Sequence, residues 1–194
     1  MAPGGRGPVR AGGGGDPVRA WAFFAGVLLL YALETSLVVP LWGVRADLVF
    51  VLVCITALHV GWWEGAVAGF AAGLLVDVAD GHLIGLGAAA KGLAGAAVGW
   101  VGRSLFESHA LVPALVILCA SALEQSFYVL GTLAFGLHLP LGEAVVRVIL
   151  PSTWYDAIVG VILYPVLAPV VRRVLAAGQP DAGAGPVEGH GGYK

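Results

Sequence analysis

Charged side chains are scarce in this chain of 194 residues. Lysine, arginine, aspartate and glutamate together make up 11% of it, whereas hydrophobic residues make up 59%. Soluble domains carry roughly 25% charged residues, so the composition argues against a water-soluble fold. The formal net charge is only −2, and no basic stripe accompanies the aromatic residues. Because a nucleic-acid-binding protein needs clustered positive charge to contact phosphates, we expect no nucleic-acid partner.

Metal-ligating and catalytic patterns are missing as well. The two cysteines, Cys54 and Cys119, lie inside apolar runs, and no CxxC, HExxH or Cys/His cluster is present. We therefore expect neither a metal nor another cofactor. No serine or cysteine has a nearby histidine and acid that would support covalent catalysis. The nearest approach to a lipid-modifying site is His82 beside Asp80 and Asp77, where a solvated turn is expected. The sequence predicts a protein without enzymatic activity.

Both ends of the chain are rich in glycine and have almost nothing to bury. We expect disordered cytoplasmic tails at residues 1–20 and 176–194, on either side of one transmembrane domain at 21–175. The apolar stretch from Trp21 continues to Leu41 without a cleavage site for a signal peptidase. This favours a first membrane helix over a cleaved signal peptide.

Six apolar stretches are long enough, some of them barely, to cross a bilayer, for which a helix needs about 20 residues. The predicted spans are 21–41, 46–63, 64–80, 83–103, 110–137 and 152–174. The fold class is therefore all-α, a bundle of about six transmembrane helices. In this arrangement seven basic residues lie on the side of the termini and two, Arg45 and Arg147, on the other. The positive-inside rule then places both termini in the cytoplasm, as expected for a multi-pass protein of the cell (inner) membrane, in contact with the lipid bilayer.

Residues 138–151 are bracketed by Pro140 and Pro151, and they place Glu143 and Arg147 four positions apart. That spacing puts the pair on one face of a helix, which favours a short amphipathic helix on the outer surface. An ordinary loop whose apolar residues pack on the bundle explains the segment equally well. Both alternatives stay open from the sequence.

Two neighbouring spans carry small residues at every fourth position, on one helical face. On that face the third span has Gly65, Gly69, Gly73 and then Asp77, and the fourth span has Gly87, Lys91, Gly95 and Gly99. A face without side chains lets another backbone approach closely, so both are expected to be packing faces. The charges of Asp77 and Lys91 should then point to a helix neighbour and away from lipid. We predict that these two residues form an ion pair, because the long lysine side chain could reach Asp77 or Asp80.

The other intramembrane ionisable groups of interest are Glu34, Glu124, which lies beside Gln125, and Asp156. Ionisable groups in a membrane are functional candidates by default, and the alternative is that each one fixes helix register through hydrogen bonds. For Asp156 the structural alternative is favoured, because Pro151 and Ser152 are typical of a helix start, where an acid suits the helix dipole.

Residues 69–99, GFAAGLLVDVADGHLIGLGAAAKGLAGAAVG, resemble the most recognisable stretch of the rod shape-determining MreD family. In that family a Gly-Phe pair, Gly-Leu-Leu and an acid end one helix, and a Gly-Leu-Gly opening starts the next. The matching residues are Gly69, Phe70, Gly73, Leu74, Leu75, Asp77, Gly85, Leu86 and Gly87. The preceding Ala46-Asp47-Leu48 is similar to the Pro-Asp-Leu that opens the second helix in many members. Lys91 is not part of the family pattern.

The resemblance covers about residues 20–175 and implies a function. It implies a non-catalytic membrane subunit of the cell-elongation (rod shape) complex, which helps to organise lateral peptidoglycan synthesis. The implied partners are a MreC-like bitopic membrane protein, a MreB-like actin filament, and a peptidoglycan polymerase and transpeptidase. The family is also similar in fold to the substrate-capture subunits (S-components) of energy-coupling-factor transporters.

That last similarity supplies the alternative function, a substrate-binding membrane subunit of a vitamin or metal transporter. Asp77, Lys91, Glu124 and Gln125 could converge on a polar ligand from the outer half of the bundle. Against this alternative, the outer loops lack a long aromatic-rich lid, and a ligand site usually needs several convergent polar groups. The sequence favours the shape-determining role.

Overall fold

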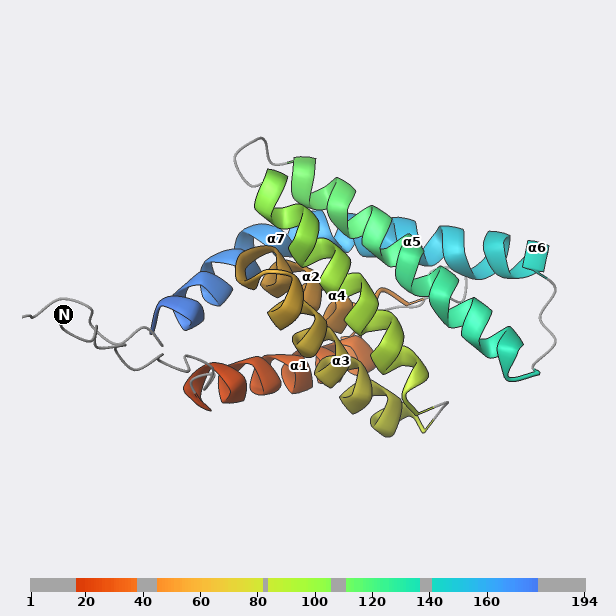
Figure 1. The fold of residues 1–194 in the computed structure, drawn as a ribbon, viewed down its shortest axis with the longest axis horizontal. Coiled ribbons are helices and arrows are strands. Elements are labelled where there is room, and N and C mark those ends of the chain that lie inside the picture. The colour runs from red at the N-terminus through yellow and green to blue at the C-terminus, as the bar shows by residue number, and fades with distance from the viewer. Residues whose placement is uncertain (1–16, 38–44, 82–83, 106–110, 137–140, 178–194) are drawn as a thin grey trace, which may run out of the picture.

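The structure, a computed structural model, describes residues 17–37, 45–81, 84–105, 111–136 and 141–177. These residues form helices and short turns, and no strand occurs among them. The elements are α1 (Pro17–Leu37), α2 (Leu48–Val60), α3 (Trp62–Asp80), α4 (Leu86–Leu105), α5 (Leu111–Ala134), α6 (Leu141–Ala144), a π-helical turn η1 (Val145–Ile149) and α7 (Leu150–Ala177). Figure 1 shows them as one bundle in which α3 and α4 run side by side.

The first helix begins earlier than predicted. It starts at Pro17, so residues 17–20 belong to α1 and not to a tail. Proline suits this position, because the first turn of a helix needs no backbone donor and the ring fixes a helical φ. The last helix likewise includes Ala176 and Ala177. The rest of the two predicted tails, residues 1–16 and 178–194, lies outside the described residues.

Residues 141–149 are helical and continue directly into α7, so the predicted boundary at Pro151 is wrong. A proline inside a helix removes one donor and crowds the carbonyl four residues earlier, which here is that of Arg147. The π-helical turn η1 lies directly before Pro151 and widens the helix at that point. The predicted pairing on one helical face is confirmed, since Arg147 Nη1 lies 3.0 Å from Glu143 Oε1.

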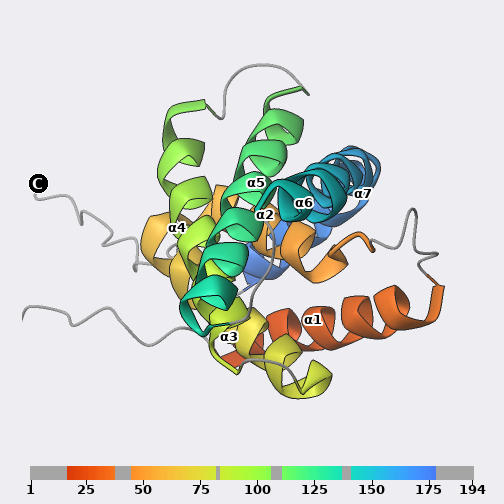
Figure 2. The ribbon, with the colours of Figure 1, turned by 90° about the vertical axis from the view of Figure 1, so that its right-hand side faces the viewer.

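Helix α2 lies at the centre of the bundle and is surrounded by the others (Figures 1 and 2). Every residue from Leu48 to Ala57 is buried. With 13 residues it is about 20 Å long, which is less than the roughly 30 Å of a hydrocarbon core. A helix this short begins and ends inside the molecule, so its terminal polar groups need partners there.

Helices α3 and α4 pack backbone to backbone through their glycines. A Cβ atom added to Gly73 would lie 2.6 Å from Ala88 Cα, and one added to Gly65 would lie 2.7 Å from the carbonyl oxygen of Gly95. Real Cβ atoms do not approach so closely, so the two helices can be this near only because the side chains are absent. The family-pattern residues Phe70 and Leu74 point the other way and are exposed.

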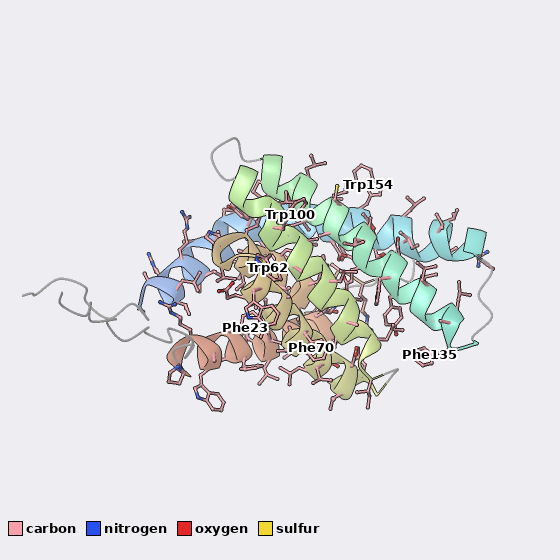
Figure 3. The ribbon with its side chains drawn as sticks, viewed as in Figure 1. Phe23, Trp62, Phe70, Trp100, Phe135 and Trp154 are labelled. Carbon is pink, nitrogen blue, oxygen red and sulfur yellow. The ribbon has the colours of Figure 1, made fainter. Side chains whose placement is uncertain are left out.

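Within the described part of the chain, three helical stretches are long and apolar enough to cross a membrane. They are Trp62–Asp80, Pro113–Ala134 and Val145–Ala177, and α2 is a shorter apolar helix. Large apolar side chains cover the outside, among them the labelled Trp154, which points away from the helices in Figure 3. An apolar exterior is what a bilayer requires, because lipid cannot solvate charges.

Gly73→Val should destabilise the bundle by roughly 1–3 kcal/mol, the usual cost of overpacking, because valine cannot fit between α3 and α4. Gly142→Val is the matched control, since a Cβ there meets no atom within 4 Å. Thermal unfolding of the purified proteins in detergent measures the difference. Equal midpoints for the two variants would contradict the close packing.

Candidate functional site

The amino end of α2 is held by three carboxylates from different parts of the chain. Asp47 is the N-cap, and its Oδ1 accepts a 2.6 Å hydrogen bond from the Phe50 amide. The Leu48 amide donates to Glu34 Oε2 of α1 at 3.0 Å. The Asp47 amide donates to Asp156 Oδ1 of α7 at 2.8 Å. Amides at a helix start have no partners within the helix, and carboxylates suit the positive end of its dipole.

Lys91 reaches this cluster from α4. Its ammonium forms an ion pair with Asp47 Oδ2 and a second one, at 2.6 Å, with Glu124 Oε1 of α5. Only 4% of Lys91 is exposed, and its Nζ lies 5.6 Å from the centre of the Phe50 ring. A buried ammonium needs such partners, because an unpaired charge inside a membrane protein is costly. We call Glu34, Asp47, Lys91, Glu124 and Asp156 the charged centre.

Asp156 is fully buried, and it occupies no helix start. Because the helix already runs from residue 141, the predicted role of this acid as a partner of its own helix dipole is wrong. The carboxylate instead lies at the positive end of the α2 dipole, where its Oδ1 accepts a hydrogen bond from the Asp47 amide. Its Oδ2 accepts a 2.5 Å hydrogen bond from Ser121 Oγ of α5. Asp156 thus joins α2, α5 and α7.

Asp77 has a different partner from the one predicted. Its Oδ2 accepts hydrogen bonds from the Gly85 amide at 2.8 Å and from the Ala88 amide at 3.1 Å. The predicted ion pair with Lys91 is therefore wrong, because Lys91 is bound to Asp47 and Glu124. Asp77 caps the start of α4 from the end of α3. Gly85 has φ +99°, which only glycine adopts easily, and it has no side chain that could cap the helix itself.

Gly87 leaves room for this cap, since a Cβ at that position would collide with the Asp77 carboxylate. The acid and the Gly-Leu-Gly opening of the family pattern thus form one local structure, in which an aspartate on one helix caps the next. Gly95 and Gly99 extend the same close approach toward the start of α3.

A polar cavity of about 170 Å³ lies beside the charged centre. Its polar lining consists of Asp47, Asp77, Asp80, Lys91, Glu124, Gln125 and Tyr128. Asp80 is exposed at the end of α3, and its Oδ1 accepts a 2.6 Å hydrogen bond from the Tyr31 hydroxyl of α1. The cavity therefore brings together Asp77, Lys91, Glu124 and Gln125, the four residues that the alternative function required.

Sequence reasoning misses the role of Asp47 as an N-cap. It singles out Asp47 only as part of a family-like tripeptide, although its position directly before a fully apolar run is typical of an N-cap. His82, the nearest candidate for a lipid-modifying histidine, lies outside the described residues. Among the residues that the structure does describe, no three His, Cys, Asp or Glu side chains are arranged to hold a metal ion.

These features define a class: a helical membrane protein with an apolar exterior and with a cluster of buried charges around one short central helix. The family model for the rod shape-determining protein MreD matches residues 17–174. The chain therefore belongs to the MreD family, whose role is in rod shape determination. Comparison with curated proteins gave no match, and comparison with solved structures gave none either.

Lys91→Met should lower the free energy of unfolding by about 3–5 kcal/mol, because it leaves the buried Glu124 and the partly buried Asp47 without their cation. Adding Asp47→Asn and Glu124→Gln removes both unpaired charges and should restore part of the loss. Arg147→Met breaks an exposed pair and should cost at most about 1 kcal/mol. Denaturation in detergent would refute the pairing if Lys91→Met were no worse than Arg147→Met.

Asp77→Leu should cost roughly 1–2 kcal/mol, the usual value of a lost helix cap, whereas Asp77→Asn should cost less, because its amide oxygen still accepts hydrogen bonds. Hydrogen exchange at the first turn of α4 should rise in the leucine variant and stay near the native rate in the asparagine variant. Similar exchange in both would show that Asp77 acts through its charge and not through the cap.

Proposed function

We propose that this protein is a non-catalytic membrane subunit of the cell-elongation complex, where it helps to organise lateral peptidoglycan synthesis. The family match over residues 17–174 carries this proposal. The interior supports it, because the charged centre joins helices α1, α2, α4, α5 and α7 to one another and has the bonding of a structural core.

The proposed topology has six spans in the inner membrane and both termini in the cytoplasm. Helices α1 to α5 supply five of the spans, and the continuous helix from Leu141 to Ala177 supplies the sixth. The short α2 is compatible with this arrangement, because polar side chains of its neighbours meet its amino end. The excess of basic residues on the side of the termini supports the orientation.

The proposed partners are a MreC-like bitopic membrane protein, a MreB-like filament, and a peptidoglycan polymerase and transpeptidase. Contacts with membrane partners would form on helix faces that are apolar and unoccupied within the chain. Exposed large side chains include Leu28 and Leu29 on α1 and Ile158, Ile162 and Val166 on α7. Helices associate in lipid through close packing of such faces.

Depletion of the protein tests the shape-determining role. Cells that lose it should become round, and expression of the native chain should restore rods. Gly142→Val should also restore rods, whereas Gly73→Val should restore them less well, because its bundle is destabilised. Cells of normal shape that instead require an added vitamin or metal would overturn the proposal and favour the transport alternative.

A photo-crosslinking amino acid at single positions tests the proposed mode of contact. At Leu28 or Ile162 it should capture the membrane helix of the bitopic partner from at least one of the two helices. At buried Val53 it should capture no partner, because that side chain is enclosed by the chain itself. Capture from none of the exposed positions on α1 and α7 would exclude packing through these faces.

A further inference from the structure

The polar cavity beside the charged centre is short of positive charge. Four carboxylates, those of Asp47, Asp77, Asp80 and Glu124, line it, and among the described residues Lys91 is the one cation in its lining. Asp77 accepts hydrogen bonds from the amides at the start of α4, and Asp80 accepts one from the Tyr31 hydroxyl. The single ammonium of Lys91 forms ion pairs with both Asp47 and Glu124.

One atom of this set has no partner among the residues that the structure describes. Glu124 Oε2 is buried and accepts no hydrogen bond, although its sister oxygen binds Lys91. Glu124 is only 5% exposed and lines the cavity. A buried carboxylate oxygen without a donor is costly, so a donor from outside the chain would be stabilised there.

From this geometry we propose that the cavity binds a small organic cation through a primary ammonium group. An ammonium offers three donors, and the cavity offers acceptors on Glu124, Gln125 and Tyr128 together with the net negative charge of its walls. A volume of about 170 Å³ has room for roughly five or six water-sized groups, at about 30 Å³ each. A bare metal ion fits less well, since the described acids form no metal-holding group.

This site would be separate from the helix faces that contact partners. Its walls come from α2, α3, α4 and α5, and Asp80 lies at the exposed end of α3, which gives a ligand a polar rim. Binding would add bonds between helices whose spacing the charged centre already sets. The proposal does not depend on the shape-determining role, because it can be measured on the purified protein alone.

Isothermal titration of the full chain in lipid nanodiscs tests the site, with 1,4-diaminobutane as the probe. The amine should bind saturably, and neutral 1,4-butanediol of the same length should not bind. Glu124→Gln should weaken binding at least tenfold, and Glu143→Gln, the same change at an exposed position, should leave it unchanged. If Glu124→Gln fails to fold, Asp80→Asn at the exposed rim replaces it, with a weakening of several-fold expected.

Three results would overturn the proposal. The first is the absence of saturable amine binding, which would mean that a proton or water satisfies Glu124. The second is equal affinity in the native protein and in the cavity variant. The third is saturable binding of Mg²⁺ or Na⁺ without any binding of the amine, which would make the site one for inorganic ions.

Discussion

The amides at the start of α2 are bonded to carboxylates of the chain itself. The helix is 13 residues long and buried from its first residue, so its amino end lies within the bundle. Backbone donors at that depth must be satisfied by the protein. Carboxylates from α1, from the residue before α2, and from α7 satisfy them, and the middle one, Asp47, is in turn paired with Lys91. The ion pair between Lys91 and Asp47 therefore ties the position of α4 to the start of α2.

Helix α4 can take that position only because the facing residues of α3 are glycines. A side chain on Gly69 would strike the backbone of Lys91 itself, so the bare face of α3 lets the lysine backbone come close while its side chain extends to Asp47. Asp77 then fixes where α4 begins. The small-residue face and the charged centre thus form a single arrangement. A shift of α4 by one turn would break the ion pairs as well as the packing.

The sequence predicts part of this arrangement and cannot predict the rest. The four-residue spacing of Gly65, Gly69 and Gly73 is a local pattern, so the bare face is readable, and the MreD family follows from residues 69–99. Which carboxylate meets Lys91 depends on how α2 and α5 pack, since Asp47 is 44 residues away and Glu124 is 33. Proximity along the chain favoured Asp77, although its carboxylate is already taken by the start of α4. The predicted helix boundary at Pro151 is wrong because a π-helical turn before the proline lets the helix continue through it. No local sequence signal marks such a turn.

The charged centre also affects the spacing of helices at the outer surface. Two apolar grooves open between helices, one of about 190 Å³ between α1 and α7 over α2, and one of about 290 Å³ between α4 and α5. The two helices that flank each groove also supply members of the centre: Glu34 and Asp156 for the first groove, Lys91 and Glu124 for the second. Lipid gives no hydrophobic drive for helix association, so partner choice depends on surface shape. Directional bonds at the centre hold the walls of both grooves at fixed spacing, which apolar packing alone would specify less strictly. The interior charges would therefore be the means by which a protein with an apolar surface presents a defined shape to the proposed partners.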